Sequence, residues 1–238
     1  MTCKNCTTEI TQNYCPQCGN PAKLHRIDGH YILHEIEHLI HFERGLLYTL
    51  KELILRPSQS IKHFITDDRN RLVKPIIFVI ITSLIYSFVN AIFHVEVGFI
   101  HFKEANPTAI GAIFKWLEGH YGYANLFFGF FIAAYAKLLF RKYGYNFFEI
   151  LILMCYVLGV QMLIFSIFTV MTVTIKLELM IFAVIISLFY TVWVISHFFD
   201  KTKILSYFKA LFTYFAGMAT AAGLLLLVGI LIEEMKRR

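Results

Sequence analysis

Four cysteines within the first eighteen residues form two C-x-x-C pairs, Cys3/Cys6 and Cys15/Cys18. Each pair can present two thiolates from a tight turn, and two such turns can hold one tetrahedral ion, as in a small zinc ribbon. Gly19 follows the second pair and can adopt the left-handed conformation that such a turn needs. The pattern therefore predicts one structural Zn²⁺ site, because four protein thiolates leave no coordination position for a substrate.

The segment 1–21 is too short to bury a hydrophobic core, so we expect the metal to fold it. Zinc binding contributes about 10 to 16 kcal/mol in zinc-finger peptides. Two disulfides are the alternative, but they require an oxidising compartment. The topology derived below places the N-terminus in the cytoplasm, which favours zinc.

A second candidate site is the H-E-x-x-H sequence that begins at His34. On a helix, this spacing puts His34 and His38 on one face, where they could bind zinc while Glu35 activates a water molecule. His30 and His41 fall on the same face. The sequence thus offers a further metal site at these four histidines, with Glu35 as the candidate base.

Three interpretations of this histidine face stay open. The histidines could be the solvated or packed side of a helix at a membrane surface, a noncatalytic metal or pH-sensing cluster, or the centre of a zinc hydrolase. The extended metzincin pattern is absent, because Leu39, Ile40 and His41 follow His38. We therefore assign no catalytic residue and favour a protein that is not an enzyme.

The composition is that of a membrane protein. Of 238 residues, 58% are hydrophobic and 16% are aromatic, and the mean hydropathy is +0.62. Crossing about 30 Å of hydrocarbon takes roughly 20 apolar residues. Five segments meet this requirement, at residues 75–95, 121–140, 148–172, 179–197 and 210–232.

The basic residues predict the orientation of these spans. They gather before the first span, at Arg141 and Lys142 between the second and third, and from Lys201 to Lys209 between the fourth and fifth. The positive-inside rule places these clusters, and the N-terminus, in the cytoplasm. Five spans then leave the basic tail 236–238 outside, unless the loop 107–116 enters the bilayer, so the side of the C-terminus stays open.

The residues 22–74 form the link between the ribbon and the bundle 75–238. Apolar residues recur there at spacings near three and four, which predicts amphipathic helices, and Pro57 and Ser58 interrupt the pattern. Such helices could lie flat on the cytoplasmic surface or pack beneath the bundle.

The predicted spans carry little chemistry. No Asp, Glu, Lys or Arg lies at the middle of a span, where coupled transporters usually need one. We expect the polar residues there to form interhelical hydrogen bonds, and a small-residue face in the last span to pack closely. These residues are Thr82, Ser83, Asn90, Asn125, Gln161, Ser166, Ser187 and Thr220, and Ala216, Gly217, Ala221, Ala222 and Gly223.

Motifs for phosphate loops, dinucleotide binding and serine hydrolases are absent. The net charge of +6 does not indicate nucleic-acid binding, since the bases lie at the ends of spans.

Several segments together resemble a known family. These are Cys3–Gly19, the run from His34 to Glu52, the Arg56-Pro57-Ser58 break and the stretch from Asp68 to Pro75. They are similar to an uncharacterised family of bacterial integral-membrane proteins, a domain of unknown function that joins a zinc-ribbon-like C-x-x-C/C-P-x-C-G segment to several spans. Relatives often have Gly at the positions of Ser58 and Asp68. The resemblance implies architecture and leaves function open.

The sequence thus predicts an all-α polytopic membrane protein with about five transmembrane helices, a small N-terminal zinc ribbon and cytoplasmic amphipathic helices. We expect a multi-pass protein of the bacterial inner membrane, with its N-terminus in the cytoplasm, acting as a scaffold, sensor or accessory protein. A membrane-bound zinc metalloprotease is the alternative, and a channel or transporter is the third hypothesis. The expected partners are the lipid bilayer, a cytosolic protein at the ribbon and further copies of the chain in a homo-oligomer.

Overall fold

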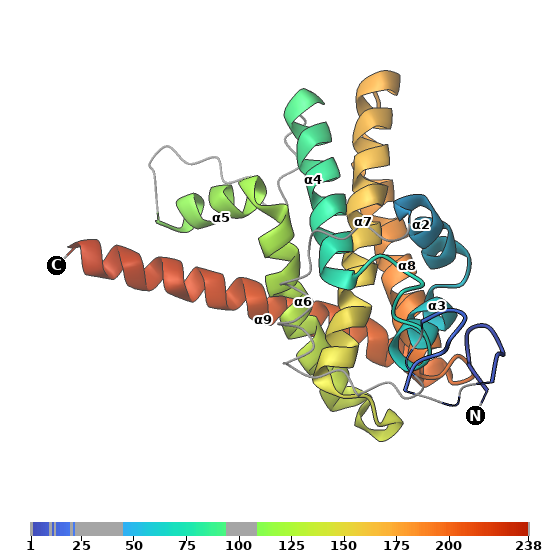
Figure 1. The fold of residues 1–238 in the computed structure, drawn as a ribbon. Coiled ribbons are helices and arrows are strands. Elements are labelled where there is room, and N and C mark those ends of the chain that lie inside the picture. The colour runs from blue at the N-terminus through green and yellow to red at the C-terminus, as the bar shows by residue number, and fades with distance from the viewer. Residues whose placement is uncertain are drawn as a thin grey trace.

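The structure is a computed structural model that describes residues 2–9, 11, 13–19, 21, 45–93 and 109–237. Over these ranges it has no strand, only two isolated β-bridges in the cysteine segment. The helices (Figure 1) are α2 (Leu46–Leu55), α3 (Pro57–Thr66), α4 (Pro75–Phe93), α5 (Ala109–Gly119), α6 (Tyr121–Leu139), the 3₁₀ turn η1 (Arg141–Tyr143), α7 (Phe147–Ile175), α8 (Met180–Phe199) and α9 (Ile204–Arg237).

Five of these helices, α4, α6, α7, α8 and α9, are long and apolar enough to cross a membrane. The expected all-α polytopic fold is therefore confirmed. In α7, 78% of the most apolar stretch is buried, compared with 39% or less in the other four helices. A helix that is apolar on all sides must be surrounded by other helices or by lipid. Hence α7 is the interior helix, and the other four turn apolar sides outward.

The last helix is longer than its predicted span, 210–232. It begins at Ile204 and continues to Arg237, because polar residues such as Lys209 and Glu233 favour helix but lower the hydropathy. At the start of α7, the Asn146 side chain accepts a hydrogen bond from the Glu149 amide at 2.8 Å, and the Asn146 amide donates to the Glu149 carboxylate at 2.7 Å. This capping box fixes where α7 begins.

The helices α2 and α3 pack against the bundle. Pro57 occupies the first turn of α3, where its missing N–H costs nothing, and the helical pattern breaks at Arg56 as expected. The Ser58 hydroxyl donates to the Val194 carbonyl of α8 at 3.0 Å, and the Tyr190 hydroxyl of α8 donates to the Leu53 carbonyl at 3.0 Å. The helices α2 and α3 therefore contact α8 directly, through Ser58 and Tyr190.

The connection between α3 and α4 is partly buried, although it carries many charges. The Val73 amide donates to the Thr49 hydroxyl at 2.9 Å, and the Val73 carbonyl accepts from the Tyr156 hydroxyl at 2.8 Å. Asp68 is buried and accepts a hydrogen bond from the Asn70 amide at 2.9 Å. These bonds satisfy backbone groups that would otherwise be buried without partners, so the segment can lie against α7.

The polar residues predicted in the spans differ in their bonding, and among the described residues the Asn90 Oδ1 and the Ser187 Oγ are buried without a hydrogen-bond partner. Interhelical bonds do form between Asn125 and Ser83 at 3.1 Å, and from Gln161 to Thr191 at 2.6 Å. Other hydroxyls bond within their own helix instead, because a Ser or Thr side chain reaches the carbonyl one turn back. Of the residues expected to bond between helices, Thr82 bonds to the Phe78 carbonyl, Ser166 to that of Met162 and Thr220 to that of Ala216.

Part of the small-residue face of α9 packs closely against another helix. A Cβ at Gly217 would lie 2.7 Å from the Cα of Ile132 in α6, so α6 and α9 meet backbone to backbone there. Ala221 is fully buried. At Gly223 a Cβ would meet nothing within 4 Å. The close packing predicted for this face therefore extends over Gly217 and Ala221 but not Gly223.

Replacing Gly217 by Ala should destabilise the bundle by about 1 to 3 kcal/mol, because the Ile132 backbone cannot yield to a new methyl group. The Gly223→Ala control should leave stability unchanged or raise it slightly, since Ala favours helix and the site is open. Thermal unfolding of the detergent-solubilised chain would measure both. Equal stability of the two variants would contradict the close α6/α9 contact.

The two ends of the bundle are distinct. At one end, the connection between α6 and α7 touches the connection between α8 and α9, and Lys62 of α3 lies over the Phe198 ring at 5.5 Å. At the other end, the Ala109 amide of α5 donates to the Glu233 carboxylate near the end of α9 at 3.0 Å. The cysteine segment lies at the first end, through Lys4 and Asp67. In Figure 1 the N-terminus lies on one side of the molecule, and the C-terminus lies on the other side, at the far end of α9.

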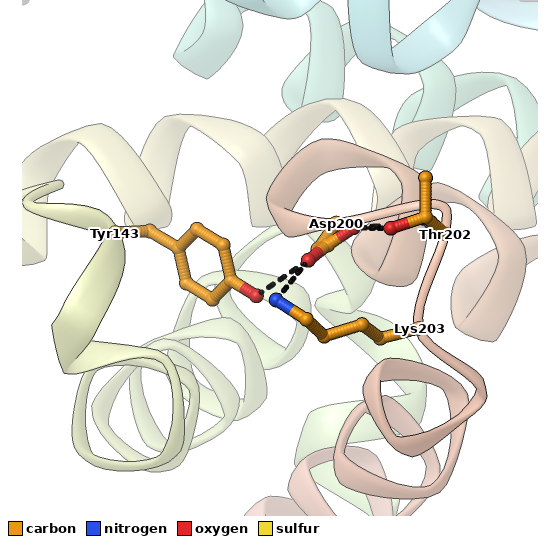
Figure 2. A network of polar contacts seen from close by, with 4 residues as sticks. All are labelled: Tyr143, Asp200, Thr202 and Lys203. Atoms are coloured by element: carbon orange, nitrogen blue, oxygen red, sulfur yellow. Dashed lines mark hydrogen bonds and ion pairs between the residues drawn. The ribbon is translucent and has the colours of Figure 1, made fainter.

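A polar network joins the two connections at the first end, as Figure 2 shows. The Tyr143 hydroxyl donates to the Asp200 carboxylate at 3.2 Å, and the Lys203 ammonium lies 2.8 Å from the same oxygen. The Thr202 hydroxyl donates to the other carboxylate oxygen at 2.6 Å. The hydrogen bonds from Lys203 and Thr202 hold the pKa of the Asp200 carboxyl well below its usual range.

An Asp200→Asn variant should be less stable than the parent at pH 7, and this difference should shrink in acid. Because the folded-state pKa is depressed, the ionised carboxylate stabilises the fold above the unfolded-state value of about 3.9, and this contribution is lost as the pH falls toward the folded-state pKa. Unfolding temperatures of parent and variant between pH 7 and pH 3 would test this. Glu178→Gln, at an exposed site beyond α7, is the control. A parent-to-variant difference that does not change with pH would contradict the role of the charge.

Candidate metal centre

The cysteine segment consists of two similar turns, each closed by one antiparallel β-bridge. Thr2 pairs with Glu9 around the first C-x-x-C, and Tyr14 pairs with Pro21 around the second. Within the turns, the Thr7 amide donates to the Cys3 carbonyl and the Gly19 amide donates to the Cys15 carbonyl, both at 2.9 Å. The repeated spacing in the sequence thus produces a repeated backbone turn, and the two turns face each other through their sulfurs.

The four thiols, Cys3, Cys6, Cys15 and Cys18, form one cluster. All four Sγ atoms lie within 4.8 Å of one another. The Sγ of Cys6 lies 3.5 Å from those of Cys15 and Cys18, and the Cys3 to Cys18 distance is 3.6 Å. Four sulfurs at about 2.3 Å from a tetrahedral ion would be about 3.8 Å apart. The cluster could therefore hold a metal ion.

The same distances exclude disulfides, which were the alternative. A disulfide requires about 2.05 Å between sulfurs, and all five cysteines of the chain are free. Cys3 and Cys15 are buried, while Cys6 and Cys18 are partly exposed. Cys3 and Cys15 are thus shielded from water, whereas Cys6 and Cys18 lie on the more open side of the cluster.

The surroundings of Cys6 favour its thiolate form. The Thr8 hydroxyl lies 3.3 Å from its Sγ. Hydrogen bonding to the Thr8 side chain, and next to its backbone amide, lowers the pKa of the Cys6 thiol to about 6. The Thr8 hydroxyl donates its own proton to the Gln17 side chain at 2.6 Å, and this bond links the two turns. A metal ion requires thiolates, and this turn already stabilises one.

Thr7 is a residue that sequence reasoning missed. It follows Cys6 as Gly19 follows Cys18, and both are left-handed, with φ of 61° and 72°. Gly19 was expected to adopt this conformation, but a β-branched residue pays a steric cost for it. The internal repeat was the available signal, since equal turns at the two pairs require equal backbone angles at positions 7 and 19.

Among the described residues, an ion pair connects the cysteine cluster to the bundle. The Lys4 ammonium, inside the first C-x-x-C, lies 2.8 Å from the Asp67 carboxylate just after α3. Lys4 remains 68% exposed and Asp67 24% exposed, and surface ion pairs contribute about 0 to 1 kcal/mol. This ion pair therefore adds little to the stability with which the cysteine cluster is held against the bundle.

The histidine face lies outside the described residues. His30, His34, Glu35, His38 and His41 all fall in the segment 22–44, so their arrangement stays a prediction. The fifth cysteine, Cys155, is buried in α7, where it acts as a small apolar side chain.

Comparison with known families gives one match. Residues 43–87 match a family model described as "Protein of unknown function (DUF3667)". The matched range contains α2, α3, the partly buried connection and most of α4. Neither the curated proteins nor the solved structures gave a match. The chain is thus a multi-pass membrane protein whose first bundle helices resemble a family of unknown function.

Gly19→Thr should weaken metal binding about fivefold, because a β-branched residue in the left-handed region costs about 1 kcal/mol or more. No atom lies within 4 Å of a Cβ at this position, so the effect would come from the backbone and not from a clash. Thr7→Gly should have the opposite effect and tighten binding. Competition titrations with a chromophoric zinc chelator would measure both variants. Unchanged affinity in Gly19→Thr would show that the turn does not depend on this angle.

Proposed function

We propose that this chain is a scaffold, sensor or accessory protein of the bacterial inner membrane and not an enzyme. Its N-terminal zinc ribbon would lie in the cytoplasm and dock a cytosolic protein. The observation that carries the proposal is the closed cluster of four thiols on a small appendage at one end of an apolar helical bundle. Closed four-thiolate sites shape a surface and leave no open position for chemistry.

The donor set favours zinc. Soft thiolates select zinc, copper(I) or iron–sulfur clusters over magnesium or calcium. Sulfur separations of 3.5 to 3.6 Å are close to those expected around one tetrahedral ion. Zn²⁺ does not change its oxidation state, so one ion could fix the shape of this segment without an electron donor or acceptor.

Two facts support a cytoplasmic N-terminus. Free thiols and a metal thiolate site persist in a reducing compartment. The end of the bundle that contacts the cysteine cluster also carries the basic residues of the two connections at 140–146 and 200–203, which the positive-inside rule assigns to the cytoplasm. With five spans, the C-terminus would then lie outside, and α5 adds no sixth span because it has only 11 residues.

The ribbon surface offers groups suited to protein recognition. Tyr14 is 65% exposed, and Asn5, Pro16 and Gln17 are exposed at the tips of the two turns. Exposed tyrosines are enriched in protein interfaces because they combine apolar area with a polar group. Since the metal fixes both turns, docking would require it.

The purified chain should bind one zinc ion, and Cys15→Ser should abolish this binding, because three thiolates leave the site open. Cys155→Ala is the matched control, since this thiol is buried in the bundle and should leave metal content unchanged. Metal content per chain can be measured by mass spectrometry, and substituted Co²⁺ should show the absorption of a tetrahedral thiolate site.

The same measurement separates the two leading functions. A second zinc per chain, lost in His34→Ala, would favour the metalloprotease, and Glu35→Gln would then be expected to abolish peptide cleavage. One zinc that depends only on the four N-terminal cysteines supports the scaffold. Retention of full zinc content after Cys15→Ser would overturn the ribbon itself.

A further inference from the structure

The first end of the bundle carries an excess of positive charge. The ranges 137–149 and 197–209 contain six bases and two acids. The bases are Lys137, Arg141, Lys142, Lys201, Lys203 and Lys209, and the acids are Glu149 and Asp200. None of these eight residues belongs to the cysteine cluster.

Both acids are already engaged inside the fold. Glu149 is buried and accepts the Asn146 amide in the cap of α7. Asp200 accepts hydrogen bonds from Tyr143, Thr202 and Lys203 (Figure 2). Neither carboxylate is left to neutralise the neighbouring bases.

Three of the remaining bases are exposed, and two, Lys137 and Lys209, are partly buried. Arg141, Lys142 and Lys201 are exposed and have no carboxylate partner among the described residues. Lys209 lies over the Phe140 ring at 5.9 Å, and its ammonium donates to the Leu139 carbonyl at 3.4 Å. We call Arg141, Lys142, Lys201 and Lys209 the basic corner.

In a membrane, the basic corner would lie where the spans leave the hydrocarbon layer. It occupies the short connections between α6 and α7 and between α8 and α9, and all four helices are long enough to span. Tyr143 and Asp200 hold the two connections together at 3.2 Å, so their bases share one level. Exposed apolar side chains, Leu138, Phe208 and Phe212, lie on the adjoining ends of α6 and α9. Phosphates meet bases and acyl chains meet apolar side chains at this boundary.

We propose that the basic corner binds the phosphate headgroups of anionic phospholipids, whose acyl chains lie along the adjoining ends of α6 and α9. Three exposed bases without acid partners would give a preference for an anionic over a zwitterionic headgroup. The Lys209 ammonium, which the Leu139 carbonyl holds at the end of α6, would keep a constant position in the site. Each base near a membrane surface contributes about a fivefold change in binding.

The test compares two triple variants of equal charge. Arg141→Gln, Lys142→Gln and Lys201→Gln together remove the exposed part of the basic corner. Lys115→Gln, Lys176→Gln and Lys236→Gln remove three exposed lysines at the opposite end. The detergent-solubilised full chain would be titrated with phosphatidylglycerol and with phosphatidylcholine, and bound lipid counted by native mass spectrometry.

The parent should prefer phosphatidylglycerol, and the corner variant should lose about ten- to one-hundredfold in affinity for it, whereas the control variant should change less than about twofold. Raising the salt concentration should weaken the preference of the parent, since exposed charges are screened. If the corner variant does not stay folded, the three single substitutions decide, each with an expected loss of about two- to fivefold. A parent with no preference between the lipids, or equal losses in the two triple variants, would overturn the proposal.

Discussion

The contact of the stretch from Val73 to Phe78 with α7 is the interaction on which the rest of the bundle depends. Tyr156 donates to the Val73 carbonyl, and the Phe78 ring occupies the space beside Gly159, where a Cβ would lie 2.5 Å from a ring atom. The position of α4 on α7 is therefore fixed at two points, by the Tyr156–Val73 hydrogen bond and by the contact of the Phe78 ring with Gly159. Because α7 is buried on most sides, its other neighbours take their positions from the same helix.

The membrane imposes a second constraint at the ends of the helices. Backbone groups in hydrocarbon must bond within the protein, and the connections from α6 to α7 and from α8 to α9 pair polar groups close to the helix ends. Asn146 and Glu149 cap α7, and Asp200 ties the α8 to α9 connection to η1. Because Glu149 and Asp200 are bonded in these turns, three exposed bases nearby have no acid partner in the part of the chain that the structure describes. The positive character of this end is thus a consequence of how the turns are built.

The sequence predicted the helices better than it predicted the hydrogen-bond partners of their polar side chains. The five spans follow from apolar length alone, and the break at Pro57 follows from proline chemistry. The hydroxyls of Thr82, Ser166 and Thr220 were expected to bond between helices, yet they bond to their own helix. Which carbonyl a hydroxyl reaches depends on rotamer and on the facing helix, and neither can be obtained from residue spacing.

The sequence by itself determined the class of the protein, the count of candidate spans and the four thiols of the cysteine cluster, because apolar length and ligand spacing are local properties of the chain. Only the tertiary structure decided that Thr7 shares the left-handed turn of Gly19, that α2 and α3 pack on the bundle, and that the basic residues of two distant connections form one corner. These depend on which surfaces meet across long separations in sequence. These long-range contacts depend on how all the helices pack together, and this packing cannot be obtained from any one segment.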